Sequence, residues 1–215
     1  MEMMNETKKA YELEPFFANV GCIIMASGLG KRFGGNKLMA DFLGKPMMEY
    51  ILDATEGLCE KRVVITRHEE VAELCRKKNV RVVVHDLPHR SDAVRLGMEA
   101  IGEAEGYLFC PADQPLLRRD TVKKLIGAAM KKQEEIWRVG SQEFSGAPVL
   151  FPKWCQEELR TLPEGKGGSW ILKKYPTAVK IFYVDNGHEL MDVDTQETLK
   201  FLESYALEVE YFGKK

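Results

Sequence analysis

The sequence lacks several features that would place it in a specialised class. Its 215 residues contain no apolar run near the ~18 residues that a membrane span needs. Lysine and arginine total 31 against 33 for aspartate and glutamate, and the net charge is -2. A surface for nucleic acid or membranes needs a basic excess. We therefore expect neither of these partners, and any anion site must be local.

Cysteine is also used in a way that excludes two frameworks. The five cysteines are odd in number, form no C-x-x-C pair, and have no histidine beside them at zinc-ligand spacing. We expect reduced thiols in the core rather than disulfides or a structural metal. The amino-terminal stretch is polar and has no apolar signal-peptide core, so we expect a cytoplasmic protein.

Short apolar runs alternate with stretches of helical periodicity along the chain. The runs at 20–26, 62–66, 80–84, 107–110 and 179–184 predict buried strands. Helices are predicted from Pro46, around Val71, and after caps at Ser91 and Asp120. This alternation predicts an α/β fold with a doubly wound, mainly parallel sheet.

The second half of the sequence adds an irregularity to this pattern. Residues 136–140 and 144–151 predict two extended segments and a small antiparallel excursion, and residues 162–168 predict a surface loop. A last helix is predicted near Asp194, with Glu197 as its capping-box partner. There are no repeats, low-complexity tracts or linkers. We expect a single domain over 20–215 after an amino-terminal extension over 1–19.

The most informative segment follows the first predicted strand. Residues 25–37 combine four glycines with Lys31, Arg32 and Lys37. Glycine lets backbone N–H groups approach an anion, and the cations neutralise a polyphosphate. The carboxyl end of a parallel strand is where ligands bind in such folds, which favours a phosphate site over an exposed basic turn. Asn36 breaks the P-loop pattern and Phe33 breaks the dinucleotide fingerprint.

This segment resembles the opening of the MobA-like NTP transferases, and among them the molybdenum cofactor cytidylyltransferases. The matching positions are Ala26, Gly28, Arg32, Phe33, Gly34, Lys37, Leu43, Gly44, Lys45 and Pro46. Ser27 departs from the family's usual alanine or glycine. The resemblance implies a Rossmann-like nucleotidyltransferase fold over residues 20–215.

The resemblance also implies roles for the residues of this segment. Arg32 would hold the β and γ phosphates of an NTP, and Lys37 would steady the α-phosphate in the transition state. Arg32 and Lys37 would thus be catalytic residues. The nucleotide-binding residues would be Ala26, Ser27, Gly28, Leu29, Gly30, Lys31 and Gly34.

Three later stretches extend the resemblance. Residues 90–97 resemble the family's base-contacting loop, with Ser91 and Asp92 as nucleotide-binding positions; Ser91 as a helix cap is an alternative that can coexist. Residues 110–116 resemble its aspartate–proline segment, in which Asp113 would be catalytic and bind Mg²⁺. Residues 191–199 resemble its aspartate–valine–aspartate–threonine segment. Asp194 would be the second metal carboxylate, with a simple helix cap as the alternative, and Asp192 would support it.

The expected acceptor side departs more from the family. Residues 145–151 resemble the wall of its acceptor pocket, so Gly146 and Pro148, with Asp192, are the implied acceptor-binding residues. Lys166 and Ser169 stand where the family often has an aspartate and an alanine–arginine pair. We therefore expect acceptor contacts here to differ.

The resemblance implies Mg²⁺-dependent transfer of a nucleoside monophosphate from an NTP to a small phosphorylated acceptor such as molybdopterin, with release of pyrophosphate. Residues 26–28 favour CTP, because guanylyl members tend to have two adjacent glycines there. A molybdenum hydroxylase is the implied client. Three alternatives remain open: a nucleotidyltransferase for a sugar phosphate or another small acceptor, a non-catalytic nucleotide-binding protein of cofactor maturation, and a nicotinamide oxidoreductase.

Overall fold

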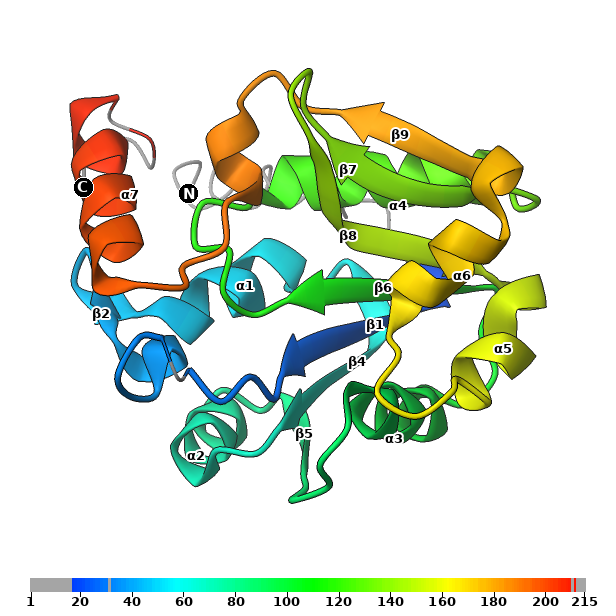
Figure 1. The fold of residues 1–215 in the computed structure, drawn as a ribbon, viewed down its shortest axis with the longest axis horizontal. Coiled ribbons are helices and arrows are strands. Elements are labelled where there is room, and N and C mark those ends of the chain that lie inside the picture. The colour runs from blue at the N-terminus through cyan, green and yellow to red at the C-terminus, as the bar shows by residue number, and fades with distance from the viewer. Residues whose placement is uncertain (1–16, 31, 210, 212–215) are drawn as a thin grey trace, which may run out of the picture.

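A seven-stranded sheet forms the centre of the molecule (Figure 1). The computed structural model describes residues 17–30, 32–209 and 211. Across the sheet the order is β5 (Arg81–Val84), β4 (Cys59–Thr66), β1 (Phe17–Ala26), β6 (Gly106–Pro111), β8 (Ser145–Pro152), β7 (Ile136–Gly140) and β9 (Val179–Tyr183). Two short strands, β2 (Asp41–Phe42) and β3 (Lys45–Pro46), pair separately.

The strand directions confirm the predicted mainly parallel sheet with an antiparallel excursion. β1 is parallel to both β4 and β6, and β4 is parallel to β5. β8 is antiparallel to β6 and to β7, whereas β7 and β9 are parallel. β8 is therefore the reversed strand, and its first residues lie at the edge where the parallel strands end. β1 begins at Phe17, before the expected Val20, and residues 1–16 lie outside the described residues.

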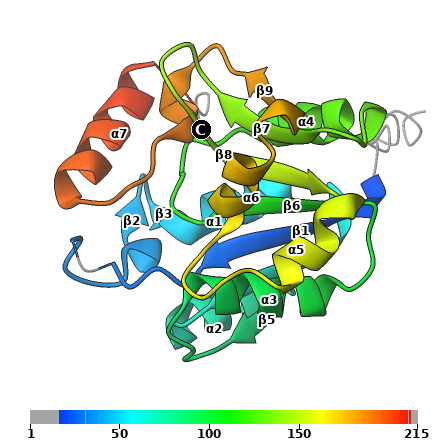
Figure 2. The ribbon, with the colours of Figure 1, turned by 45° about the vertical axis from the view of Figure 1, so that its right-hand side comes forward.

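Helices cover both faces of the sheet (Figure 2). One face carries α1 (Met47–Thr55), α2 (Glu69–Lys77) and α4 (Arg119–Lys131), and α7 (Gln196–Glu208) packs at its edge. The other face carries α3 (Arg90–Ile101), α5 (Gln156–Arg160) and α6 (Gly168–Lys174). Within the described part of the chain, no helix is long and apolar enough to cross a bilayer.

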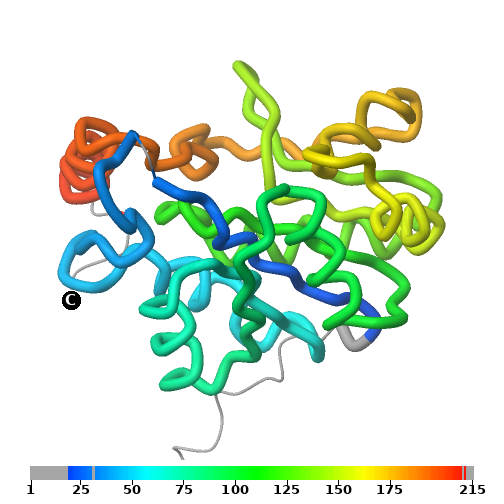
Figure 3. The backbone as a smooth tube through the Cα atoms, turned by 60° about the horizontal axis from the view of Figure 1, so that its bottom comes forward, coloured from blue at the N-terminus to red at the C-terminus, as the bar shows by residue number. Residues whose placement is uncertain are grey.

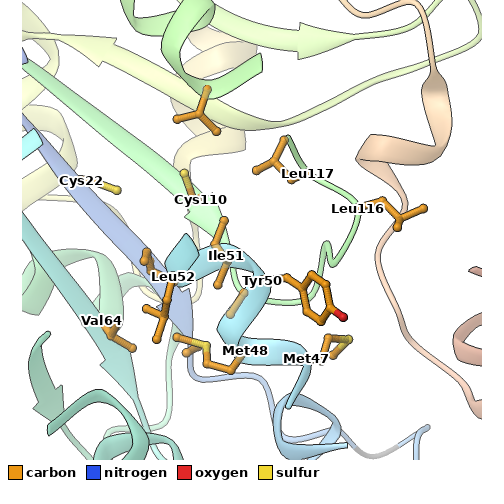
Figure 4. Close-up of a cluster of buried hydrophobic side chains, with 14 of the residues drawn as sticks. Cys22, Met47, Met48, Tyr50, Ile51, Leu52, Val64, Cys110, Leu116 and Leu117 are labelled. Atoms are coloured by element: carbon orange, nitrogen blue, oxygen red, sulfur yellow. The ribbon is translucent and has the colours of Figure 1, made fainter. Parts of the chain in front are cut away.

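The continuous apolar run of β1 is explained by burial on both of its faces. Cys22 and Ile24 belong to the core under α1, and Ile23 belongs to the core under α3. Figure 4 shows the first of these cores, with Met48 and Ile51 of α1 lying over the sheet. Full burial of an isoleucine side chain is worth about 1.5–3 kcal/mol. This central strand therefore anchors both layers.

For two helices, the predicted N-cap residue is wrong, because the helix begins at a different position. α3 begins at Arg90 with His89 as its N-cap, and the Asp92 carboxylate accepts the His89 N–H at 2.9 Å, so Ser91 lies inside the helix. α4 begins at Arg119, which places Asp120 inside its first turn. An N-cap needs extended backbone, which His89 has (φ -103°, ψ 150°), and residue type alone did not locate it.

The predicted cap of the last helix is wrong too, and this bears on the site. Thr195 is the N-cap of α7, and its Oγ1 accepts the N–H of Thr198 at 3.2 Å. Glu197 is consequently not at the capping-box position. The Asp194 carboxylate points elsewhere, toward two cations described below. The reading of Asp194 as only a helix cap is therefore excluded.

The predicted loop over 162–168 is held against α3. Leu162 is buried, and the N–H of Gly165 donates to Ser91 Oγ at 3.2 Å. A Cβ on Gly167 would lie 2.7 Å from Cδ of Arg90, so this residue lets the loop approach the helix closely. The loop thus packs over the edge where the parallel strands end.

Candidate functional site

The glycine loop after β1 turns back on itself at Gly30. This residue has φ +58°, and its carbonyl accepts the N–H groups of Phe33 at 2.9 Å and Gly34 at 3.2 Å. A Cβ at Gly30 would lie 2.3 Å from the carbonyl oxygen of Gly35. Only glycine fits both the left-handed backbone and this approach. Lys31, a predicted nucleotide-binding residue, lies outside the described residues.

Lys37 is the centre of a cluster that joins three distant segments. It begins the 3₁₀ turn Lys37–Met39 and is 7% exposed. Its Nζ donates to Asp113 Oδ2 at 2.6 Å and to Asp194 Oδ1 at 3.0 Å. Arg32 Nη2 donates to the other carboxylate oxygen of Asp194, Oδ2, at 2.7 Å. The structure therefore brings together the residues predicted as catalytic and metal-binding.

The charges of this cluster stabilise one another. Burial lowers the pKa of Lys37, but Asp113 and Asp194 more than offset it and raise that pKa above its ordinary value. Burial raises the pKa of Asp194, yet the hydrogen bond from Lys37 and the charges of Lys37 and Arg32 hold it below its ordinary value. The lysine is charged and the aspartate ionised near neutral pH.

Asp192 lies in a different environment from Asp194. Burial, followed by the negative charge of Asp113, raises the pKa of Asp192 to about 6. The buried side chain of Gln114 donates to Asp192 Oδ1 at 3.0 Å and to the carbonyl of Leu190 at 3.1 Å. The N–H of Val193 donates to the carbonyl of Asp113 at 2.9 Å. These bonds fasten the segment before α7 to the loop after β6.

A cleft of about 670 Å³ lies at the carboxyl ends of the parallel strands. Of the predicted site residues, those that line it are Ser27, Gly28, Leu29, Asp113, Gly146 and Asp192. Lys37 reaches the cleft through its contact with Asp113, and Arg32 and Asp194 belong to the same cluster. Ala26, Gly30 and Gly34 shape the backbone that leads from β1 to Lys37.

Three predicted site residues neither line the cleft nor belong to the Lys37 cluster or the glycine loop. Ser91 is fully buried, with its hydroxyl accepting the Gly165 N–H. The Asp92 carboxylate accepts the His89 N–H and pairs with Arg95. Pro148 is buried within β8, and its neighbours Ala147 and Val149 line the cleft instead. Their predicted contacts with ligands remain predictions.

His85 was missed by the sequence reasoning. Its ring lines the cleft, and its Nε2 lies 2.8 Å from Ser27 Oγ, which donates to the carbonyl of Ile65 at 3.0 Å. The hydroxyl proton is thus used, so Nε2–H of His85 is the donor to Ser27. Burial and the charge of Arg67 lower the pKa of His85, in keeping with a neutral ring. A histidine directly after a predicted strand was the available signal.

Arg138 of β7 was also missed. It lines the cleft, and its Nε donates to the carbonyl of Gly146 at 3.1 Å while Nη2 donates to that of Ser145 at 2.7 Å. Burial lowers its pKa. The available signal was an arginine in the middle of the apolar run 136–140.

The donor set fits a hard divalent cation, such as Mg²⁺, that takes oxygen ligands. Residues 17–30, 32–209 and 211 contain no group of three or more histidine, cysteine, aspartate or glutamate side chains placed to hold a metal. Asp113 and Asp194 nevertheless converge on a single cation, the ammonium of Lys37. Mg²⁺ commonly uses one or two carboxylates, and phosphate and water complete its shell. These two residues fit that ion.

A doubly wound sheet, a glycine loop after β1 and a lysine between two carboxylates define a nucleotidyltransferase-type α/β fold. The chain belongs to the MobA-like NTP transferase domain family, whose model matches residues 22–179.

Curated relatives support the family at modest identity. A bifunctional protein GlmU of Thermosipho africanus is 29% identical over 196 residues, which covers 85% of this chain and 44% of that protein. A probable molybdenum cofactor guanylyltransferase of Bacillus cereus is 29% identical over 119 residues, covering 53% of this chain and 58% of that protein. The chain thus spans only part of the length of these relatives.

Solved structures show the same fold. Rv0371c from Mycobacterium tuberculosis aligns with a TM-score of 0.75 at 21% identity, covering 87% of this chain and 98% of that one. A synthetase for CMP:2-keto-3-deoxy-manno-octonic acid, solved with CTP, has a TM-score of 0.74 at 14% identity over 89% of this chain and all (100%) of that one. Rv0371c has also been solved as a manganese complex.

Proposed function

We propose that this protein transfers a nucleoside monophosphate, CMP, from an NTP to a small phosphorylated acceptor, molybdopterin, and releases pyrophosphate. The observation that carries the proposal is the contact of the Lys37 ammonium with both Asp113 and Asp194 beside the cleft. A merely structural ion pair would not need a glycine loop and a second cation, Arg32, at the same place.

The chain's own residues suit an in-line displacement at the α-phosphorus. Negative charge grows on the phosphate oxygens and on the leaving pyrophosphate, so positioning and electrostatic stabilisation provide most of the catalysis. Backbone N–H groups of the glycine loop and Arg32 would hold the β and γ phosphates. Lys37, whose pKa is raised, would remain charged beside the α-phosphate.

Asp113 and Asp194 would hold Mg²⁺, which supplies electrostatic stabilisation of the phosphate oxygens when bound. The acceptor needs little activation, because the second pKa of a phosphate monoester lies near ~6. No general base is therefore required. Gly146 would wall the acceptor, and Asp192 would close the same side.

The cytidylyl preference has structural support at Ser27. Its side chain lines the cleft and contacts the His85 ring, and a glycine at position 27 would leave that space open. Less room for the base favours a pyrimidine over a purine. The named molybdenum cofactor relatives are guanylyltransferases, so the base and the acceptor belong to the proposal.

The direct test is pyrophosphate release with Mg²⁺ from CTP, GTP, ATP and UTP, each with and without molybdopterin. We expect release from CTP only when the pterin is present. Release with a sugar phosphate instead of the pterin would contradict the acceptor, and release from GTP would contradict the base. NTP binding without release for any acceptor would favour a non-catalytic accessory protein.

A further inference from the structure

The lining of the cleft follows the order of the strands. From one end to the other it runs through His85 after β5, Arg67 after β4, Ser27 after β1, Asp113 after β6, Gly146 on β8 and Arg138 on β7. The glycine loop and Asp113 directly follow the neighbouring strands β1 and β6. If the reacting phosphorus lies there, the acceptor occupies the β8–β7 end, and Arg138 forms its far wall.

Arg138 differs from Lys37 and Arg32, the two cations of the cluster, in its partners. Lys37 and Arg32 are each paired with a carboxylate. Within the described residues, Arg138 has no ion pair; its two hydrogen bonds go to the backbone carbonyls of Ser145 and Gly146. Burial lowers its pKa, and no acidic side chain among the described residues forms an ion pair with it. A half-buried cation without a counter-ion is costly.

The guanidinium also has unused donors and room beside it. A guanidinium carries five N–H groups, of which the two carbonyls take two. A Cβ built on Gly146 would meet no atom within 4 Å, so the cleft is open next to the carbonyl that Arg138 holds. The hydrogen bonds to the two carbonyls fix the orientation of the guanidinium. Its remaining N–H groups are available to bind a planar or tetrahedral anion.

We propose that Arg138 binds an anionic group of the acceptor, a phosphate, and so selects anionic acceptors. This inference rests on the proposed function. It places a cation on β7 in an acceptor half that lacks the family's usual arginine near Ser169. The competing role for Arg138 is purely structural, as a clamp on the first residues of β8.

The test uses Arg138→Gln, which keeps an N–H donor for the carbonyls but removes the charge, and Arg138→Lys, which keeps the charge. Arg81→Gln is the matched control, because Arg81 also donates to a backbone carbonyl but begins β5 at the opposite edge of the sheet. Inorganic phosphate is titrated calorimetrically into each protein saturated with Mg²⁺ and an α,β-methylene analogue of CTP, which fills the triphosphate site.

We expect Arg138→Gln to weaken phosphate binding about tenfold or more, and Arg138→Lys and Arg81→Gln to stay within about threefold. In the molybdopterin assay, Arg138→Gln should raise the KM for the pterin and leave the KM for CTP unchanged. Wild-type phosphate affinity in Arg138→Gln would overturn the proposal. Equal losses in the glutamine and lysine variants would do so as well, because they would indicate a clamp.

Failure of the proposed function can be distinguished from failure of the proposal for Arg138. If the wild type transfers nothing to molybdopterin, the proposed acceptor is wrong. The phosphate titration still tests whether Arg138 binds an anion. If Arg138→Gln does not fold, phenylglyoxal labelling of the wild type replaces it. Phosphate should then slow modification of Arg138 and leave that of Arg81 unchanged, and equal rates at Arg138 with and without phosphate would overturn the proposal.

Discussion

The two ends of the cleft satisfy their charges in opposite ways. At the β1–β6 end, Lys37 and Arg32 share the carboxylates of Asp113 and Asp194. At the β8–β7 end, the hydrogen bonds of Arg138 to other described residues go to the backbone carbonyls of Ser145 and Gly146. The first arrangement keeps its cations in place before any ligand arrives. The second leaves a charge to be neutralised by the ligand itself, which suits the part of a site that varies with the acceptor.

The largest expected effect is at the first end. Lys37→Ala removes the positive charge that we propose to lie beside the α-phosphate and should lower kcat by about 1,000-fold, while circular dichroism shows an intact fold. Asp113→Ala should act similarly. Lys45→Ala, which removes a partly exposed lysine paired with Asp53, is the control and should keep its activity. A Lys37 or Asp113 variant with near-normal turnover would take that residue out of the mechanism.

Substitutions at the neighbouring residues Asp194 and Thr195 distinguish a catalytic role from a helix-capping role. Asp194→Asn should lower activity about tenfold to 100-fold and raise the Mg²⁺ concentration needed for half-maximal rate. Thr195→Ala removes the cap of α7 and should cost about 1 kcal/mol of unfolding free energy with little change in kcat. The pair is measured by magnesium titration and by urea unfolding. An Asp194→Asn enzyme with an unchanged magnesium requirement would contradict the metal role.

Gly30→Ala tests whether the loop backbone binds the triphosphate. The added Cβ meets the Gly35 carbonyl at 2.3 Å on a backbone with φ +58°, so the loop must rearrange. We expect the KM for CTP to rise about tenfold, corresponding to strain of 1–3 kcal/mol. Gly35→Ala, whose Cβ meets nothing within 4 Å, is the matched control. Equal KM values for both variants would argue against backbone binding by this loop.

The smallest effect is expected at Ser27. Ser27→Ala removes the hydroxyl that bonds His85 and Ile65, which enlarges the space for the base. We expect the ratio of kcat/KM for CTP over GTP to fall by about threefold to tenfold, since one lost hydrogen bond is worth about 1 kcal/mol. Arg81→Gln again serves as the control. An unchanged ratio would remove Ser27 and His85 from base selection.

Much of the architecture could be predicted because it depends on local pattern. The apolar run of β1 is continuous because Ile23 and Ile24 face opposite helical layers, and both are fully buried. The loop after it was recognisable because glycine and cations have few other uses together. The reversed strand β8 was detected because two extended segments followed each other without a helix between them.

The hydrogen-bond and ion-pair partners of polar side chains were harder to predict. Asp92 and Asp194 each stand close to a helix start, yet Asp92 accepts the N–H of His89, the N-cap of α3, whereas Asp194 bonds Lys37. That choice depends on which cation the fold brings nearby, and the sequence distance from Lys37 to Asp194 hides it. Arg138 was missed because a charge within a strand usually marks a solvated face. Here the cleft, not bulk water, lies beside that face.

The reversed strand also has a consequence for how the chain assembles during synthesis. The tube in Figure 3 shows β7 and β8 joined by a turn that projects away from the rest of the molecule. β1, β4, β5 and β6 are complete at Pro111, but β6 pairs on its outer side only with β8, which begins at Ser145. A nascent chain that has emerged from the ribosome only as far as a point between Pro111 and Ser145 presents an open, apolar strand edge. A pause in synthesis at this stage would therefore expose the chain to aggregation, and the open edge of β6 would be a binding site for chaperones.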